Sequence, residues 1–375
     1  MKMLYIHNQA KKVNNFSHSS MMAAKKLDIE FHIASNWGYN SCEERIEDEK
    51  KYGIKIHQID FIRRPYDLRN IKAYKQVCDL IKKEKYDVIH CNTPIGGVIG
   101  RLAGKKCGVK KIIYQAHGFH FFKGASFFNW LIYYPIEKWL AKITDVLITI
   151  NTDDYKLAKK KMKLRNNGEI FFVHGVGIDT KMYNKDDVMR EVKRKELGIP
   201  LDAFVVLSVG ELNRNKNNKV VISALNKIKN DSVYYVLCGD GKLYKNLKKQ
   251  TEINGLVNNV YFLGYRNDIN ELYNMADCFI MPSIREGLSR SIMEAMASGL
   301  PSVVSKIRGN TDLITNMSTG ILCESKRIDA YSDAINKLLY NVQLKEYMSR
   351  KCREDIKKYD SEIVENEMIN IYRTL

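Results

Sequence analysis

Two glutamates in the second half of the chain, Glu286 and Glu294, flank the predicted start of a helix. The apolar strand before them is predicted to end at 281–283, and the helix to begin near Leu288. Ligands of open α/β sheets bind at the carboxyl ends of strands, and a helix N-terminus offers free N–H groups, so this turn predicts a diphosphate site. A carboxylate on the helix could accept two hydrogen bonds from vicinal sugar hydroxyls. The alternatives are a helix cap for Glu286 and a solvated face for Glu294.

The run at 282–301 reads Pro-Ser-Ile-Arg-Glu-Gly-Leu-Ser-Arg-Ser-Ile-Met-Glu-Ala-Met-Ala-Ser-Gly-Leu-Pro. It resembles the Glu-x7-Glu signature of the family-4 retaining glycosyltransferases, which have the GT-B fold. The resemblance implies that Glu286 holds hydroxyls of the donor sugar and that Glu294 binds the ribose of the nucleotide. It also implies that the next backbone N–H groups bind sugar or phosphate, namely those of Gly287, Leu288 and Ser289.

A basic loop follows another predicted strand and reads Val-Gly-Glu-Leu-Asn-Arg-Asn-Lys-Asn over 209–217. It resembles the family loop Gly-Arg-Leu-x-x-x-Lys-Gly, whose arginine and lysine bind the diphosphate. Gly210 and Lys216 match this pattern, so the resemblance implies that they belong to the donor site. Glu211 stands at the arginine position, which departs from the family, and Arg214 could supply the missing charge. A solvated basic loop is the alternative for both cations.

The turn at 262–272 follows a further predicted strand. In the family this turn contacts the nucleobase, largely through backbone groups, so the resemblance makes Tyr265 and Arg266 candidates for the donor site. The alternative is that both residues only form the turn between a strand and a helix.

All eight histidines lie at or before His174, so a catalytic histidine must come from the first half and reach across a cleft. The best candidate is His117, which follows a predicted strand that ends at Ala116. The carboxyl end of a strand is where ligand groups sit. The resemblance implies that His117 corresponds to the family histidine that touches the donor sugar near the reacting carbon. A hydrogen-bonded turn histidine is the alternative.

Three segments, at 90–97, 116–124 and 129–139, make the resemblance specific to one subgroup of the family. Together they are similar to a subgroup of bacterial capsular and exopolysaccharide glycosyltransferases that extend polyprenyl-diphosphate-linked sugars. The first loop, at 7–17, lacks the glycine-rich sequence of many family members, where it usually helps to shape the acceptor side. The acceptor-side candidates are His18, His120, Lys123, Gly96 and Gly97. The two glycines would allow a close approach of a ligand or of another backbone.

An aromatic and basic stretch at 119–142 has a physical interpretation of its own. Its rings are interleaved with Lys123, Lys138 and Lys142. Such stretches suit a membrane interface, where rings sit at headgroup depth and lysines meet anionic lipid. A core helix with ordinary aromatic packing is the alternative. An anionic membrane surface therefore stays open as a partner.

The whole chain alternates apolar strands with amphipathic helices, which predicts an α/β fold with parallel sheets. Its 375 residues exceed what one hydrophobic core usually serves, so two domains are expected. The resemblance implies the GT-B fold, in which two Rossmann-like domains face each other across a cleft. We place an acceptor-side domain at 1–176 and a nucleotide-sugar-binding domain at 177–360. The tail at 361–375 is predicted to form a helix that packs back on the first domain.

The composition indicates which classes of partner and which cellular compartment to expect. The net charge of +18 favours anionic partners, although solvated lysines account for much of it. The eight cysteines are scattered without a Cys-x-x-Cys pair, and no Asp-x-Asp motif accompanies the site, so neither a metal nor another cofactor is expected. No stretch reaches ~20 apolar residues, and the start has no long apolar signal core. We therefore expect a cytoplasmic protein, at most peripheral on the inner face of the plasma membrane.

Together these features predict a retaining, metal-independent hexosyl- or N-acetylhexosaminyltransferase that uses a nucleotide sugar, with UDP favoured. The acceptor would be a lipid-linked or free saccharide in the synthesis of bacterial surface polysaccharide, and a soluble or protein acceptor is the alternative. Two other classes of protein share some of these features. A non-catalytic polyanion binder stays open, although the even spread of Lys and Arg argues against nucleic acid as a partner. An NAD-dependent oxidoreductase is disfavoured because no Gly-x-Gly-x-x-Gly follows the first strand.

Overall fold

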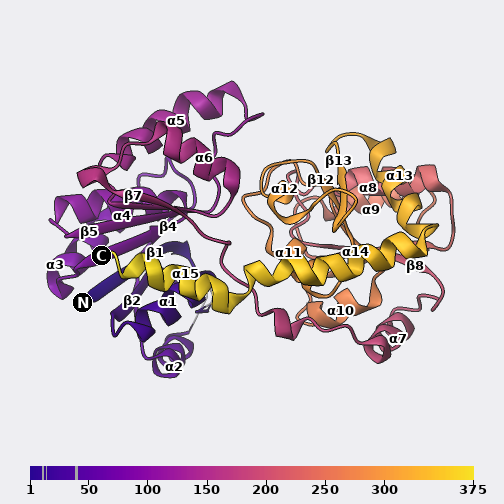
Figure 1. The fold of residues 1–375 in the computed structure, drawn as a ribbon, viewed down its shortest axis with the longest axis horizontal. Coiled ribbons are helices and arrows are strands. Elements are labelled where there is room, and N and C mark those ends of the chain that lie inside the picture. The colour runs from indigo at the N-terminus through magenta and orange to yellow at the C-terminus, as the bar shows by residue number, and fades with distance from the viewer. Residues whose placement is uncertain (11, 14, 39–40) are drawn as a thin grey trace. The chain divides into compact units, whose positions relative to one another are not determined.

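The computed structural model describes residues 1–10, 12–13, 15–38 and 41–375. The chain folds into two compact units (Figure 1). The first contains Met1–Gly177 together with Ser361–Leu375, and the second contains Ile178–Asp360. Each unit has its own parallel sheet and its own hydrophobic clusters. Among the described residues, no helix combines the length and the apolar character needed to cross a membrane.

The sheet of the first unit has seven parallel strands in the order β3-β2-β1-β4-β5-β6-β7. Its strands are β1 (Lys2–Gln9), β2 (Glu30–Asn36), β3 (Lys55–Gln58), β4 (Val88–Asn92), β5 (Lys111–Ala116), β6 (Val146–Thr149) and β7 (Glu169–Phe172). Helices cover both faces of the sheet, so its strands are buried on both sides and are nearly continuous apolar runs. The strand order reverses between β1 and β4, which is where ligands bind in such sheets.

The helices of the first unit pack on two apolar clusters, one on each face of its sheet. They are α1 (Asn15–Lys26), α2 (Cys42–Tyr52), α3 (Asn70–Glu84), α4 (Pro94–Lys106), α5 (Phe127–Ala141), α6 (Thr152–Lys161) and α15 (Ser361–Tyr372), with a short 3-10 turn, η1 (Arg165–Asn167). One cluster includes Leu4 and Ile89, and the other includes Met3 and Ile113. Helix α15 packs along α1 on the second of these faces (Figure 1).

The second unit repeats this design with six parallel strands in the order β10-β9-β8-β11-β12-β13. Its strands are β8 (Phe204–Val209), β9 (Val233–Cys238), β10 (Val260–Gly264), β11 (Cys278–Met281), β12 (Ser302–Ser305) and β13 (Gly320–Cys323). Its helices are η2 (Thr180–Met182), α7 (Asp187–Glu196), α8 (Lys219–Ile228), α9 (Tyr244–Ile253), α10 (Ile269–Met275), α11 (Arg290–Ala297), α12 (Asn310–Leu313), α13 (Ile328–Leu339), α14 (Val342–Asp355) and η3 (Ile356–Tyr359). Because β8, β11 and β12 are parallel neighbours, the loops after them leave the sheet side by side.

Strand β13 is the one element of this sheet that is missing from the predicted strands. It has only four residues, of which three form the apolar run 321–323, and so short a run does not by itself distinguish a strand from a loop. It begins at Gly320, where an added Cβ would lie 2.1 Å from Ser302 O on the neighbouring strand. Glycine is therefore required for the close approach to β12, and this contact has no local sequence signal.

Candidate functional site

Two loops at the carboxyl edge of the second sheet are tied to each other. One follows β8 and covers residues 210–217, and the other follows β11 and covers 282–289. The Ile284 N–H donates to Asn215 O at 2.8 Å, and Asn215 Nδ2 donates to Arg285 O at 2.9 Å. The predicted phosphate loop and the predicted sugar loop therefore form a single structural element.

Lys216 and Glu286 form an ion pair between these loops, with Nζ 2.9 Å from Oε1. Only 20% of the lysine side chain and 13% of the glutamate side chain are exposed. The lysine stem lies over Gly210, where an added Cβ would come within 3.2 Å of Lys216 Cε. Gly210 also has a φ of +150°, which a residue with a side chain rarely adopts. The structure thus brings together three candidates from two separate motifs.

The helix that follows the second loop is α11, and Ser289 is its N-cap residue. The Ser289 side chain makes no capping hydrogen bond, and its hydroxyl lies 3.2 Å from Met281 Sδ. The first N–H groups of a helix have no partner within the helix and carry a partial positive charge. The start of α11 is therefore suited to an anionic ligand that supplies the missing acceptors.

Glu294 lies on α11 and is held in place by two neighbours. The Tyr273 hydroxyl donates to Oε2 at 3.0 Å, and Arg290 Nε donates to Oε1 at 2.7 Å. Only 13% of the Glu294 side chain is exposed, so it does not lie on a solvated face. Burial, together with the nearby carboxylate, raises the pKa of Tyr273 well above its ordinary value. The amphipathic pattern of α10 gave no signal that would have singled out Tyr273.

Two further predicted cations lie apart from this ion pair. Arg214 is exposed and lines a separate hollow of about 800 Å³. Arg266 donates from Nε to Asp268 Oδ1 at 2.7 Å and from Nη2 to Glu196 Oε1 at 3.0 Å. These hydrogen bonds raise the pKa of Arg266 above its ordinary value. The Arg266 side chain therefore stabilises the turn before α10 through ion pairs with Asp268 and Glu196.

In the first unit, His117 follows β5 at the carboxyl edge of the sheet. Its Nε2 lies 2.9 Å from Asn92 Oδ1, and the Phe16 ring centroid lies 4.9 Å from its own. Because the amide oxygen accepts, Nε2 carries the proton, and Nδ1 is a buried acceptor without a hydrogen-bond partner among the described residues. Burial, with a smaller effect of His7, lowers the pKa of His117 to about 4. The ring is therefore neutral at pH 7 and can accept a hydrogen bond from a sugar hydroxyl.

Two acceptor-side candidates are adjacent glycines at the start of α4. The Gly96 N–H donates to Asn8 Oδ1 at 2.6 Å, close to the end of β1. At Gly97, an added Cβ would lie 2.4 Å from Tyr114 Cε2 on β5. Gly97 is thus explained by helix-to-sheet packing, whereas Gly96 lies where the strand order reverses.

The other acceptor-side candidates lie on two segments of the first unit, the loop between β5 and α5 and the helix α1. The His120 ring contacts the Tyr133 ring on α5, with centroids 4.7 Å apart. His18 is half-buried in α1, two residues after Phe16. Lys123 is exposed in the loop before α5. Of this group, only His18 lies on the same helix as a residue in contact with His117.

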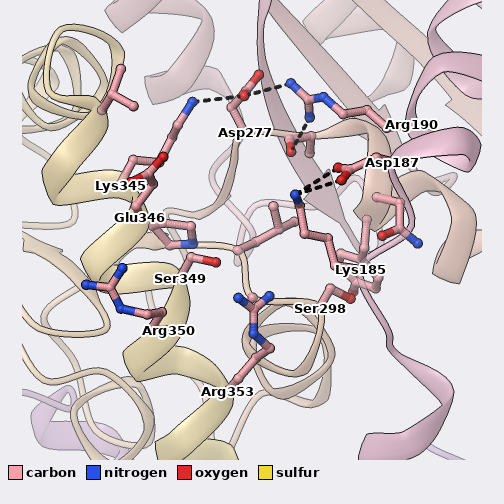
Figure 2. A pocket seen from close by; sticks show the side chains of 17 residues that line it. Lys185, Asp187, Arg190, Asp277, Ser298, Lys345, Glu346, Ser349, Arg350 and Arg353 are labelled. Carbon is pink, nitrogen blue, oxygen red and sulfur yellow. Dashed lines mark hydrogen bonds and ion pairs between the residues drawn. The ribbon is translucent and has the colours of Figure 1, made fainter.

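A second basic hollow, of about 430 Å³, lies at the opposite end of α11 (Figure 2). Ser298 and Gly299, which follow the last turn of the helix, line it. Three of its cations are already in ion pairs, namely Lys185 with Asp187, and both Arg190 and Lys345 with Asp277. Lys216 and Glu286 do not line this hollow, because they lie before the N-terminus of α11, whereas Tyr273, the hydrogen-bond partner of Glu294, does line it.

Arg308 also lies beside the candidate site, although it was not among the predicted residues. Its side chain is buried, and its Nη2 lies 3.4 Å from Glu286 O. It follows β12, which is paired with β11. An arginine directly before a glycine, just after a predicted strand, is the sequence signal that could have identified it.

The cysteines are placed as free thiols. Those described are Cys78, Cys91, Cys107, Cys238, Cys278, Cys323 and Cys352. Burial raises the pKa of Cys91 to about 12, which keeps this thiol protonated. In the part of the chain that the structure describes, no group of three or more His, Cys, Asp or Glu side chains is placed to hold a metal ion.

Comparison with known protein families assigns both halves of the chain. Residues 189–355 match the family described as glycosyl transferases group 1, and residues 2–151 match the family described as glycosyl transferase 4-like. The putative glycosyltransferase EpsD of Bacillus subtilis is 35% identical over 353 residues, which cover 93% of this chain and 90% of the relative. An Escherichia coli relative, named UDP-Gal:alpha-D-GlcNAc-diphosphoundecaprenol alpha-1,3-galactosyltransferase, is 33% identical over 298 residues, 77% of this chain and 75% of its own.

Solved structures show the same fold at low sequence identity. The Anabaena protein HepE, solved in complex with UDP and glucose, has a TM-score of 0.82 at 20% identity and is covered over 100% of both chains. A sucrose-phosphate synthase from Thermosynechococcus elongatus has a TM-score of 0.84 at 16% identity, over 100% of this chain and 98% of its own. The expected α/β fold with two Rossmann-like, parallel-sheet domains of the GT-B type is therefore confirmed.

Proposed function

Because this chain belongs to the group 1 glycosyltransferases, we propose that it transfers a hexosyl or N-acetylhexosaminyl group from a UDP-sugar to a polyprenyl-diphosphate-linked saccharide, with retention of configuration. The observation that carries the proposal is the ion pair between Lys216 and Glu286 in front of the N-terminus of α11. One pair of loops thereby offers a cation and N–H groups to a diphosphate, and a carboxylate to sugar hydroxyls.

Support for the donor and the acceptor comes from the Escherichia coli relative. Its name specifies a UDP-sugar donor and an acceptor sugar attached to diphosphoundecaprenol. Lys216 and Glu286 lie in a segment of this chain that matches the group 1 family, which covers 189–355. We therefore extend both substrate classes to this chain, in the synthesis of a bacterial surface polysaccharide.

The proposed reaction exchanges one bond at the anomeric carbon of the donor. The bond to the β-phosphate oxygen breaks, a bond to an acceptor hydroxyl oxygen forms, and the departing diphosphate takes up the proton of that hydroxyl. Lys216 and the start of α11 stabilise the negative charge that develops on the departing diphosphate, as electrostatic preorganisation requires. Glu286 orients the sugar through its hydroxyls, and Glu294 accepts from the ribose. We assign no step to a metal ion.

Ligand-dependent thermal unfolding tests the donor class. The protein is heated with UDP, GDP, ADP or NAD⁺, each in the presence of EDTA. A ligand at 100 times its Kd stabilises the folded state by about 2.7 kcal/mol, which is visible as a higher Tm. We expect a shift with UDP that EDTA does not abolish. A shift with NAD⁺ alone would support a dehydrogenase instead, and a shift that EDTA abolishes would contradict the metal-independent mechanism.

Turnover with defined acceptors tests the rest of the proposal. UDP-hexoses and UDP-N-acetylhexosamines are incubated with a polyprenyl-diphosphate-linked monosaccharide and, in parallel, with the free monosaccharide. We expect an α-linked disaccharide on the lipid from an α-linked donor sugar, identified by mass spectrometry and glycosidase digestion. Transfer to the free sugar alone would favour a soluble acceptor, and a β-linked product would show inversion.

We further propose that the outer face of α5 contacts an anionic membrane, where the lipid-linked acceptor resides. The helix turns its apolar residues outward: Phe127, Phe128, Leu131 and Trp139 are 74%, 69%, 57% and 53% exposed. Lys123, Lys138 and Lys142, which flank these rings, are exposed and match the charge of anionic lipid.

A buried ion pair fixes this orientation of α5. Glu137, on the inner side of the helix, accepts from both Nη atoms of Arg101, at 2.9 Å and 3.0 Å. Arg101 is only 1% exposed, and its guanidinium carbon lies 3.8 Å from the centre of the Tyr114 ring. Glu137 therefore points inward, and Trp130, Tyr133 and Tyr134 pack on the core of the first unit, whereas Phe127, Phe128, Leu131 and Trp139 form a second, outward-facing apolar surface on the same helix.

Vesicle sedimentation tests the membrane contact. We expect binding to vesicles that contain anionic phospholipid, weaker binding to neutral vesicles, and loss of binding in the variant Phe128→Ser/Leu131→Ser. The matched control is Leu68→Ser, which removes a side chain that is 80% exposed elsewhere in the first unit. Equal sedimentation of all three proteins would rule out α5 as the membrane contact.

A further inference from the structure

The loop after β8 lacks one of the two cations that its family pattern provides. Glu211, which is exposed, stands at the arginine position. The cation that remains, Lys216, is already within 2.9 Å of the Glu286 carboxylate. A nucleoside diphosphate brings at least two negative charges to this place, and one lysine that is shared with a carboxylate does not balance them. A second cation close to the ion pair would supply the missing positive charge.

Arg214, the other cation of the same loop, is not placed to meet this need. It is exposed and lines the hollow of about 800 Å³, together with Lys219 and Ile328. Lys216 lines a different, much smaller hollow, beside Met281 at the end of β11. The two cations of this loop therefore face different spaces.

The loop after β12 touches the sugar loop backbone to backbone. Gly309 has a φ of +79°, and an added Cβ there would lie 2.2 Å from Gly287 O and 3.3 Å from Leu288 N. No other residue than glycine fits this contact without a shift of the main chain. The residue before Gly309 therefore directly precedes this contact with the sugar loop.

That residue is Arg308, which is only 7% exposed. Its Nη2 is 3.4 Å from Glu286 O, so its guanidinium lies against the backbone of the sugar loop. A guanidinium presents a planar fork of donors that matches the oxygens of a phosphate better than an ammonium does. Its burial strengthens any charge–charge contact that it makes.

We propose that Arg308 supplies the second cation for the donor diphosphate, so that the arginine missing at position 211 is replaced from the loop after β12. This inference rests on the proposed function, because it requires that a nucleoside diphosphate binds in front of α11. In this chain the diphosphate is held between Lys216, from β8, and Arg308, from β12, with the α11 N-terminus between them. Arg308 is thus a donor-binding residue outside the two turn motifs at 209–217 and 282–301.

Calorimetric titration of the full chain with UDP and with UMP tests this assignment. For Arg308→Gln we expect the Kd for UDP to rise by about 10- to 100-fold, as for loss of a charged hydrogen bond. The Kd for UMP should rise clearly less, because Arg308 is proposed to bind the diphosphate and UMP has a single phosphate. The matched control is Arg285→Gln, which removes an exposed arginine from the same pair of loops. A merely structural role for Arg308 would instead weaken UDP and UMP equally.

A rescue variant provides a second test of the role of Arg308. Glu211→Arg restores the family arginine, so Glu211→Arg/Arg308→Gln should recover most of the UDP affinity that Arg308→Gln loses. If Arg308→Gln has a lowered Tm without ligand, Arg308→Lys is used instead. The Kd for UMP divided by the Kd for UDP should then be lower in Arg308→Lys than in the wild type. Affinity lost in Arg214→Gln but kept in Arg308→Gln would overturn the inference, as would failure of the rescue in a folded protein.

The proposed function and the role of Arg308 can be contradicted separately. If the wild-type chain binds none of UDP, GDP and ADP, the proposed function itself is contradicted. If it binds UDP but Arg308→Gln binds UDP and UMP as the wild type does, only the inference about Arg308 is contradicted.

Discussion

The ammonium of Lys216 lies 2.9 Å from the carboxylate of Glu286, and this ion pair joins two loops whose residues are 70 positions apart in the chain. In the proposed function, the lysine binds the diphosphate and the glutamate binds hydroxyls of the sugar. The pair keeps the carboxylate in a defined position before the donor binds. Donor binding can then recruit the lysine without a large rearrangement.

Replacement of Glu286 should separate turnover from nucleotide binding. In Glu286→Ala we expect turnover to fall by about 10²–10³, as when a transition-state hydrogen bond is removed. The Kd for UDP should stay the same or decrease, because Lys216 is released to the diphosphate. Steady-state kinetics, UDP titration and Tm are measured, with Glu252→Ala as an exposed control. Near-normal turnover would remove Glu286 from the mechanism.

Tyr273 should act on the nucleotide only through Glu294. Tyr273→Phe removes the hydroxyl that lies 3.0 Å from Oε2, so the carboxylate loses a positioning hydrogen bond worth about 1 kcal/mol. We expect a Kd for UDP that is about 5-fold higher, and a smaller change for 2′-deoxy-UDP, in which a ribose hydroxyl is absent. Tyr66→Phe, at a site that is 78% exposed, is the control. An equal change for both nucleotides would mean that Tyr273 acts elsewhere.

The buried pair of Arg101 and Glu137 should stabilise the first unit. Glu137→Gln leaves a guanidinium that is 1% exposed without its counter-charge, which costs about 3–5 kcal/mol. Arg101→Met/Glu137→Leu, which removes both charges, should cost less than Glu137→Gln alone. Urea unfolding of the full chain, followed by circular dichroism, measures these free energies. A double variant that is as unstable as the single one would show that packing, and not charge, dominates here.

Acidification should destabilise the first unit before its carboxylates titrate. Burial lowers the pKa of His7 to about 4, of His90 to about 3 and of His117 to about 4, from the ordinary 6.5. The unfolded chain therefore binds protons near pH 6.5 that the folded chain does not bind, and the free energy of unfolding falls as the pH falls through that value. We expect a flat free energy above about pH 7 and a decline between about pH 6.5 and 4.5.

The control for this pH dependence is His90→Asn. His90 is fully buried, with Nδ1 2.7 Å from the Tyr372 hydroxyl on α15, so its share of the slope should be the largest. Urea unfolding at several pH values gives the slope for the wild type and the variant. A free energy that does not change between about pH 6.5 and 4.5 would show that the rings titrate normally.

Much of the fold follows from local patterns in the sequence. Strands such as β5 and β8 are nearly continuous apolar runs, and the helices between them are amphipathic, which is enough to predict parallel sheets covered by helices. Strand β13 could not be predicted, because its pairing depends on the close approach of Gly320 to Ser302. The turn motifs at 210–217 and 282–301 were also readable, since each follows a strand and carries a defined spacing of charged residues.

The residue types of the candidate site and the strands that carry them were thus set by local sequence. The tertiary structure alone decided which of these side chains meet: Lys216 with Glu286, and Arg308 with the backbone of Glu286. Parallel strands bring the ends of distant segments to one edge of a sheet, so contacts at that edge join residues that are far apart in the chain. Whether a cation faces the site or another hollow depends on packing that no local pattern encodes, as the separation of Arg214 from Lys216 shows.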